Sequence, residues 1–122
     1  MYYISITGEF SGAHSLSEYP GECANIHGHN WKVKVITTCR EVNEIGISID
    51  FKILKTILND VLSGFDHKDL NKLEYFESIN PSAENISRIV FHEFKKKLPE
   101  NVTLRSVEVF ESDKYSARYE ED

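Results

Sequence analysis

The chain has 122 residues and a mass of 14.1 kDa, which is enough for one hydrophobic core but short for two domains. Its formal net charge of −6 and its lack of a basic stripe argue against nucleic acid as a partner. No apolar run is long enough for a signal peptide or a membrane span, and two cysteines do not make a disulfide framework. We therefore expect a soluble cytoplasmic protein with one domain over residues 1–122 and no membrane partner.

The first part of the chain predicts two strands, over residues 2–11 and 27–40. Apolar residues alternate with polar or charged ones over residues 30–35, as they do in a strand with one buried face. Residues 43–46 are expected to form a turn, after which residues 47–49 continue the pairing of the sheet.

Two amphipathic helices should follow, each with apolar residues at helical spacing along one face. Asp50 is expected to cap the first helix, and Gly64 to end it. In the second helix Asn80 is expected to be the cap, with Pro81 in the first turn and Pro99 beyond the end.

Two further strands are predicted over residues 102–110 and 115–119, separated by a short polar turn. The predicted fold class is α+β: an antiparallel four-stranded sheet with two helices on one face. Such an arrangement leaves the other face and the edges of the sheet uncovered. We expect the chain to cover them by assembling with copies of itself.

Three histidines in the first part of the chain predict a metal site. His27 and His29 share parity with Trp31, so both point to the inward face of their strand. His14 ends another apolar stretch, where small residues allow close approach of the backbone. Neutral imidazole suits Zn²⁺, and a catalytic zinc ion usually takes three protein ligands and keeps one open position.

Two other interpretations of these residues stay open. Each histidine can be an ordinary packed or surface residue, although an inward His-x-His with a third histidine nearby favours a metal. Cys23 lies four residues before His27, after the turn-like residues 20–22, and could complete a closed, purely structural Cys-His₃ zinc site.

Acidic residues elsewhere add candidates for proton transfer and binding. Asp66 and His67 are adjacent on a loop, where a carboxylate can fix the tautomer of an imidazole and support a proton relay. The same pair is also common at exposed helix ends. Glu111 follows the inward parity of its strand, and an inward carboxylate needs a cationic or hydrogen-bonding partner such as Arg105 or Arg118.

Six motifs resemble, in order and spacing, those of the 6-pyruvoyltetrahydropterin synthase family. The motifs are Phe10-Ser-Gly-Ala-His14, Cys23-x-x-x-His27-Gly-His29-Asn30, Asp50-Phe51, Asp66-His67-x-x-Leu70-Asn71, Asn80-Pro81-Ser82-Ala83-Glu84-Asn85 and the late Glu111. The resemblance runs from residue 2 to about residue 119.

The resemblance implies a role for each candidate residue. The zinc ligands that it implies are His14, His27 and His29. The catalytic proton-transfer set that it implies is Cys23, Asp66 and His67. Glu111 would anchor the pterin ring, whose amino and ring N–H groups can pair with a carboxylate.

The same resemblance implies the tunnelling fold (T-fold), in which subunits join their sheets into a barrel. Two trimers would stack into a homohexamer whose active sites are shared between neighbours. The implied substrate is a small molecule, 7,8-dihydroneopterin triphosphate, and Zn²⁺ is the cofactor, with no organic cofactor required.

The spacing of the cysteine motif bears on the branch of the family. Three residues between Cys23 and His27 are similar to 6-carboxy-5,6,7,8-tetrahydropterin synthase of the queuosine pathway, which releases acetaldehyde and triphosphate. The animal pyruvoyl enzymes tend to have a longer spacer, and a folate-related branch replaces the cysteine with an acid. A 6-pyruvoyltetrahydropterin synthase is the first alternative, and a zinc hydrolase or a protein with structural zinc is the next.

Overall fold

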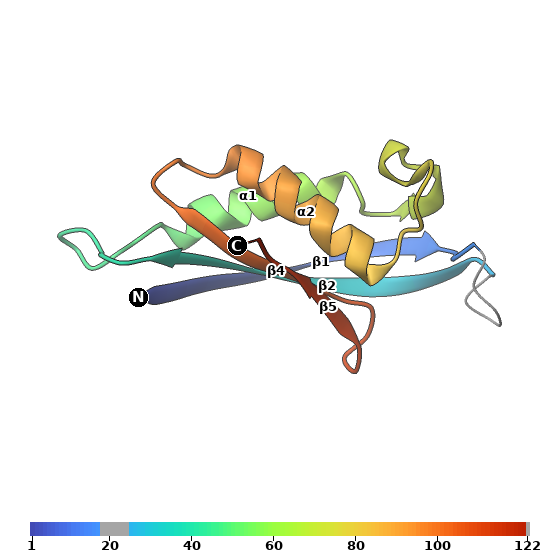
Figure 1. Cartoon of the computed structure of the whole chain (residues 1–122), viewed down its shortest axis with the longest axis horizontal. Helices are drawn as coiled ribbons and strands as arrows, with labels where there is room; N and C mark the ends of the chain where they lie inside the picture. The colour runs from blue at the N-terminus through green and yellow to red at the C-terminus, as the bar shows by residue number, and fades with distance from the viewer. Residues whose placement is uncertain (18–24, 122) are drawn as a thin grey trace.

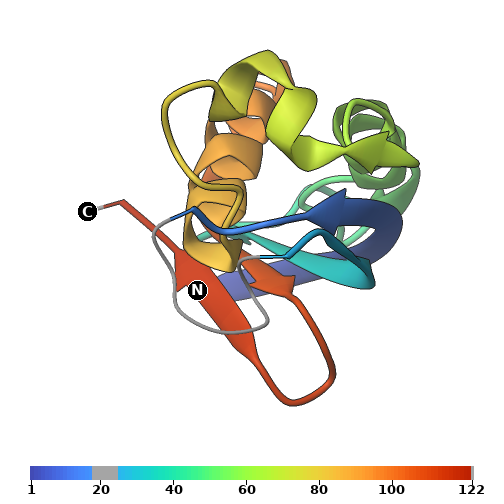
Figure 2. The ribbon, with the colours of Figure 1, turned by 90° about the vertical axis from the view of Figure 1, so that its right-hand side faces the viewer.

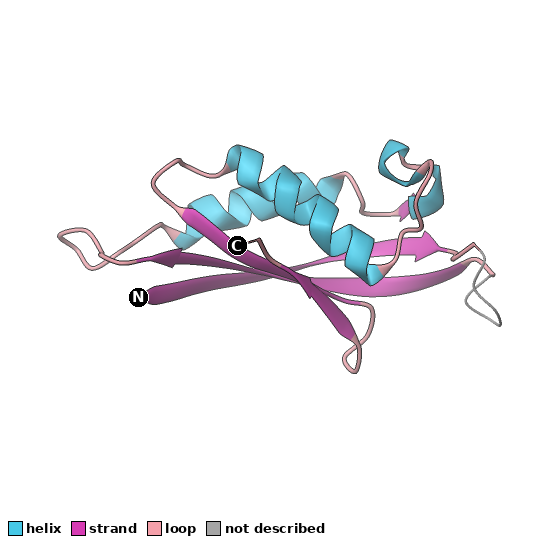
Figure 3. Cartoon of the chain, in the orientation of Figure 1, coloured by secondary structure: helices cyan, strands magenta, loops and turns pink. Residues whose placement is uncertain are grey.

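The computed structural model describes residues 1–17 and 25–121, and it shows a single sheet with two helices packed on one face (Figures 1 and 3). The strands are β1 (Tyr2–His14), β2 (His27–Cys39), β3 (Lys68–Asp69), β4 (Thr103–Phe110) and β5 (Ser116–Tyr119). The helices are α1 (Phe51–Ser63) and α2 (Ala83–Lys97), with two short 3₁₀ helices, η2 (Leu70–Lys72) and η3 (Glu74–Phe76), between them.

The sheet has the order β3-β1-β2-β4-β5. The four long strands are antiparallel, as the sequence predicts, and β3 extends the sheet by a short parallel pairing with β1. The expected pairing of residues 47–49 is wrong. The amides of Ile45 and Ile47 instead donate to Oδ1 of Asn43, and the Asn43 amide donates to the Ile47 carbonyl, so a side chain closes this turn.

The hairpin of β1 and β2 determines where the histidines lie. The two strands pair along their whole length, from Tyr2 with Cys39 to His14 with His27. His14 and His27 are therefore direct neighbours in the last pair of the ladder. His29 lies opposite Gly12, and its side chain points to the same face as that of His27 because alternate residues share a face.

Helix α1 begins as predicted, because Oδ1 of Asp50 accepts a hydrogen bond of 2.8 Å from the Lys52 amide. Gly64 is its C-cap. The helix lies close against the sheet at Gly8, where an added Cβ would sit 2.9 Å from Cδ2 of Leu58. A glycine at this place in β1 lets the helix approach the strand.

Helix α2 begins two residues later than the sequence predicts. Its N-cap is Ser82, whose Oγ accepts from the Asn85 amide at 3.1 Å. Asn80 is not the cap, because its side chain bonds instead to the backbone of Ser17. The helix ends at Lys97, shortly before Pro99.

The two helices lie over one face of the sheet (Figure 2), and the buried side chains of the core lie between these two layers. Trp31 and Val33 of β2 are fully buried there, together with Leu54 of α1 and Phe94 of α2. None of the helices in the described part of the chain is both long and apolar enough to span a membrane.

One edge of the sheet is largely open. β3 pairs only with Gly12 and Ala13 of β1, so residues 2–10 of β1 have no strand partner on that side among the described residues. The aromatic side chains of Tyr2 and Tyr3 on this strand are more than half exposed. Unpaired N–H and C=O groups along such an edge are ready to pair with another strand.

Candidate metal centre

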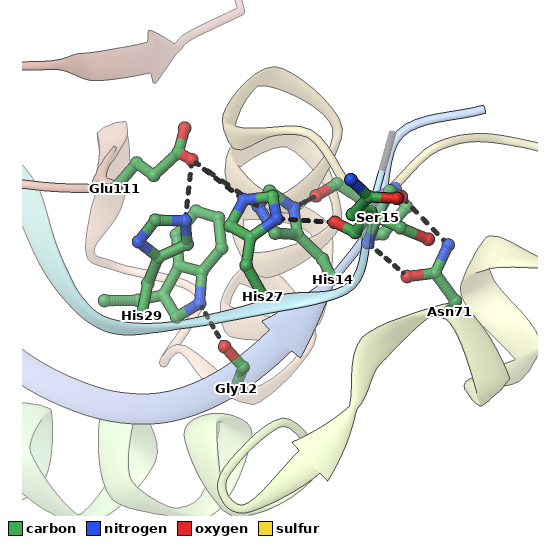
Figure 4. A network of polar contacts seen from close by, with 10 residues as sticks. Gly12, His14, Ser15, His27, His29, Asn71 and Glu111 are labelled. Atoms are coloured by element: carbon green, nitrogen blue, oxygen red, sulfur yellow. Dashed lines mark hydrogen bonds and ion pairs between the residues drawn. The ribbon is translucent and has the colours of Figure 1, made fainter. Parts of the chain in front are cut away.

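The three predicted histidines converge at the end of the β1–β2 hairpin (Figure 4). Nε2 of His14 lies 3.0 Å from Nε2 of His27. The ring of His29 stands edge-on to both, with centroids 5.2 Å from His14 and 4.7 Å from His27. His14 is almost fully buried, whereas the other two rings are partly accessible.

Glu111 supplies the fourth polar side chain of this cluster. Its Oε1 atom lies 2.9 Å from Nε2 of His29, 3.4 Å from that of His14 and 3.8 Å from that of His27. The ligand atoms of all four residues lie within 4.8 Å of one another. Arg105, one of the two arginines considered as a partner for Glu111, pairs with Glu120 at 3.6 Å instead.

Hydrogen bonds on the far side of two rings determine which nitrogen carries the proton. Nδ1 of His14 donates to the Pro81 carbonyl at 2.8 Å, and Nδ1 of His27 donates to the Asn25 carbonyl at 2.7 Å. A neutral imidazole that donates from Nδ1 has a lone pair on Nε2. Two lone pairs therefore face each other across 3.0 Å, with a carboxylate oxygen beside them.

A cation fits this arrangement. The Nε2 lone pairs of His14 and His27 and the Glu111 carboxylate oxygen repel one another unless a positive charge lies between them. Nε2 of His29 is buried and has no hydrogen-bond partner among the described residues other than the nearby carboxylate oxygen Oε1 of Glu111, 2.9 Å away. Burial lowers the pKa of His29, while the Glu111 carboxylate opposes this shift, so the neutral, ligating form of the ring is favoured.

Trp31 forms one wall of the cluster. Its ring is completely buried and meets the rings of His14 and His29 edge to face. Its Nε1 donates to the Gly12 carbonyl at 3.1 Å, which ties β2 to β1 beside the histidines. The indole therefore limits the rotation of two of the three rings.

Asp66 and His67 lie on the loop between α1 and β3. Oδ1 of Asp66 accepts from the Ser11 amide at 2.9 Å, and the His67 amide donates to the Ser11 carbonyl at 2.6 Å. Oδ2 of Asp66 lies 3.7 Å from Nε2 of His67, whose side chain is 81% exposed. His67 has a positive φ of 56°, a conformation that is uncommon for residues other than glycine and often found at functional sites.

An open hollow lies along the end of the β1–β2 hairpin and the loop that carries His67. His29 and Asn30 of β2 lie on its wall, and His67 and Lys68 lie on the wall formed by the loop after α1. Gly28 also lines it, with no atom within 4 Å of the position that a Cβ would take. Gly28 and Asn30 flank His29 in β2 and point to the face of the sheet opposite to its ring, so the hollow lies beside His67 on that opposite face.

Cys23 lies outside the described residues, so its position relative to this cluster stays a prediction. Sequence reasoning had placed Glu111 on the inward face but not beside the histidines. The sequence gives no sign that the backbone carbonyls of Pro81 and Asn25 accept hydrogen bonds from the histidines. The one signal near Pro81 is the motif that begins at Asn80.

Comparison with known proteins agrees with this geometry. The model of the family 6-pyruvoyl tetrahydropterin synthase matches residues 3–122. A protein of Archaeoglobus fulgidus, provisionally named 6-carboxy-5,6,7,8-tetrahydropterin synthase, is 39% identical over 110 residues, which cover 90% of this chain and 88% of the relative. The dihydroneopterin monophosphate aldolase of Pyrococcus furiosus is 29% identical over 117 residues, which cover 96% of each chain.

The solved structures include the 6-pyruvoyl tetrahydropterin synthase of Caenorhabditis elegans. It superposes on this chain with a TM-score of 0.89 at 27% identity, covering 99% of this chain and 96% of that one. This likeness confirms the expected fold class.

Proposed function

The chain belongs to the 6-pyruvoyl tetrahydropterin synthase family, and on that premise we propose that it is a zinc-dependent 6-carboxy-5,6,7,8-tetrahydropterin synthase. Its substrate would be 7,8-dihydroneopterin triphosphate. With one water, this compound would yield 6-carboxytetrahydropterin, acetaldehyde and triphosphate, in the synthesis of queuosine. The 39% identity to the Archaeoglobus relative and the three-residue spacer after Cys23 support this branch.

The observation that carries the proposal is the convergence of His14, His27, His29 and Glu111. Three neutral imidazoles with a carboxylate are a ligand set that suits zinc. Zinc in this cluster would supply Lewis acidity, which would lower the pKa of hydroxyl groups and of C–H groups next to a carbonyl. His14, His27 and His29 would hold it through their Nε2 atoms.

His67, Asp66 and Cys23 would transfer the protons. A general acid or base must reach the proton that it moves, and the side chain of His67 is 81% exposed and therefore accessible to a substrate. Asp66 is held by the Ser11 amide through Oδ1, which leaves Oδ2 free to orient the imidazole. Cys23, as a thiolate, would be the second proton carrier.

Glu111 would bind the pterin ring. Its Oε1 faces the three histidines, and no contact of Oε2 is found among the described residues. A carboxylate in this position can accept from the amino and ring N–H groups of a pterin. Because Oε1 is also within reach of a bound ion, the test of this role must measure zinc content and pterin affinity separately.

The active protein would be a homo-oligomer, with a hexamer of two stacked trimers as the proposed form. The open edge of β1 over residues 2–10 supports this proposal, since a strand of a neighbouring subunit can pair there. The exposure of His67 supports it as well, because a proton-transfer residue works best where a neighbouring chain excludes water from it.

Two other activities have specific support. The likeness to the nematode enzyme favours a 6-pyruvoyltetrahydropterin synthase, which would release triphosphate but no acetaldehyde. The Pyrococcus relative favours an aldolase acting on dihydroneopterin monophosphate, which would cleave the side chain without releasing triphosphate. The three activities therefore differ in their products.

Product analysis separates the three. Purified protein is incubated with dihydroneopterin triphosphate and, in parallel, with the monophosphate, and the products are identified by mass spectrometry. We expect 6-carboxytetrahydropterin and acetaldehyde from the triphosphate. A pyruvoyl product, or cleavage of the monophosphate alone, would replace the proposed reaction by the corresponding alternative, and a His27→Ala sample checks that the activity belongs to this site.

A further inference from the structure

Two asparagine side chains hold the segment that follows His14. Asn71 accepts from the Ser15 amide at 2.8 Å through Oδ1 and donates to the Ser15 carbonyl at 3.0 Å through Nδ2 (Figure 4). Asn80 does the same to Ser17, accepting from its amide at 3.0 Å and donating to its carbonyl at 3.1 Å. Each asparagine thus satisfies both backbone groups of one residue, as a neighbouring strand would.

An asparagine is suited to this task because its side chain carries an acceptor and a donor side by side. An aspartate of the same shape would keep the acceptor but would place a second oxygen against the serine carbonyl. The two held residues alternate along the chain, and each is held by an asparagine more than fifty positions away. These contacts therefore fix the path of the chain after β1 relative to the elements around α2.

Both asparagines lie next to the hydrogen bond between His14 and Pro81. Asn71 holds Ser15, the residue directly after His14, and Asn80 directly precedes Pro81. The backbone carbonyl of Asn80 in turn accepts from Nδ2 of Asn85 at 2.8 Å. The donor and the acceptor of the His14–Pro81 bond are thus each anchored by a neighbouring residue.

We propose that Asn71 and Asn80 are positioning residues of the metal centre, which hold the His14 ring against the Pro81 carbonyl and keep its Nε2 lone pair directed at the cluster. The inference rests on the proposed zinc site. It gives a role to two asparagines that the family resemblance left without one, Asn71 in Asp66-His67-x-x-Leu70-Asn71 and Asn80 in Asn80-Pro81-Ser82-Ala83-Glu84-Asn85.

The expected size of the effect follows from the chemistry of ligand orientation. Hydrogen-bond partners behind a metal-binding histidine fix its tautomer and direction, and their loss typically weakens metal binding by about 10- to 100-fold. Removing Asn71 or Asn80 leaves all four cluster residues in place. The affinity should therefore fall within that range, without the complete loss that follows removal of a histidine.

The test compares Asn71→Ala and Asn80→Ala with Asn43→Ala. Asn43 is a matched control, because its side chain also holds two backbone amides, but in the turn beyond the opposite end of β2. Each metal-stripped protein is titrated with Co²⁺, which gives a visible absorption spectrum that depends on ligand geometry, and the affinity is measured by competition with a chelator. Circular dichroism reports the fold at each step.

We expect a 10- to 100-fold loss of Co²⁺ affinity and an altered visible spectrum in Asn71→Ala and Asn80→Ala, while Asn43→Ala behaves as the unaltered protein does. If either alanine variant is unfolded, Asn71→Asp or Asn80→Asp, which keeps the volume of the side chain, is titrated in its place. Unchanged affinity and spectrum in folded variants would overturn the positioning role, whereas a failure of the unaltered protein to bind Co²⁺ or Zn²⁺ would overturn the zinc site itself.

Discussion

Nε2 of His14 and Nε2 of His27 face each other across 3.0 Å, although both rings use their only proton for a carbonyl on the opposite side. Two atoms of the same kind cannot share a hydrogen bond when neither carries a hydrogen. The contact is therefore favourable only with a cation between the rings or a proton added to one of them. In a partly buried cluster with a carboxylate, the cation is the solution that also satisfies His29.

Zinc content should depend on each histidine of the cluster. We expect one zinc ion per chain in the purified protein and nearly none in His27→Ala or His29→Ala, since each change removes one of three nitrogen ligands. Elemental analysis after dialysis measures this. His92→Ala is the control, because His92 lies on α2 and pairs with Glu121 at the surface. Full zinc occupancy in both cluster variants would show that the site is assigned to the wrong residues.

One variant can decide whether Cys23 transfers protons or binds the metal. If its thiol carries protons, Cys23→Ala should keep zinc and fold while turnover falls by about 10²- to 10⁴-fold, the usual contribution of general acid–base catalysis. Turnover, zinc content and thermal unfolding are measured on the same sample, with Cys39→Ala as the control. Loss of zinc together with stability would favour a closed structural site, and full activity would favour a zinc hydrolase.

Glu111→Gln should separate substrate binding from metal binding. The change keeps the volume but removes the charge that would pair with the pterin edge, and loss of one partner of a buried charged pair typically costs about 2–5 kcal/mol. We expect pterin affinity, measured by calorimetry, to fall accordingly while zinc stays stoichiometric. Glu108→Gln is the control, because Glu108 bonds to Ser116 away from the cluster. The opposite result, lost zinc with intact pterin affinity, would make Glu111 a metal ligand only.

Mixed oligomers should reveal whether the active site is shared between chains. Cys23→Ala and His67→Ala are each expected to be inactive. If the two residues of one site come from different subunits, a random equal mixture should regain about a quarter of full activity, since each residue is intact in half of the chains. The mixture is unfolded, refolded and assayed, and mass spectrometry verifies mixed assembly. No recovery in verified hybrids would confine the catalytic set to one chain.

Local patterns predict most of the elements of this fold. The alternation over residues 30–35 and the helical spacing after Asp50 depend only on neighbours in the chain, so both elements could be inferred. Two of the differences arose where a distant partner decides the structure. Asn80 is not a cap because its side chain accepts a hydrogen bond from the Ser17 amide. Strand β3 forms beside β1 because the Ser11 amide bonds to Asp66, which is 55 positions away in the sequence.

The same distinction applies to the candidate site. His27 and His29 share a face because of strand parity, which the sequence displays. The place of Glu111 depends on the register between β2 and β4, in which Lys32 pairs with Phe110, and no local pattern gives that register. The hydrogen bond from His14 to the Pro81 carbonyl is harder still to predict, because every residue has a backbone carbonyl and the residue type therefore gives no signal.

The pairing of His14 with His27 is also the last rung of the β1–β2 ladder. The ends of a hairpin fray before its centre, and their backbone amides exchange with solvent hydrogen soonest. An ion held by both rings would oppose this fraying, because opening the rung would also release the ion. Deuterium uptake at the amides of His14 and His27 would then be slow in the loaded protein and fast after chelation, so exchange at the end of the hairpin would report whether the ion is bound.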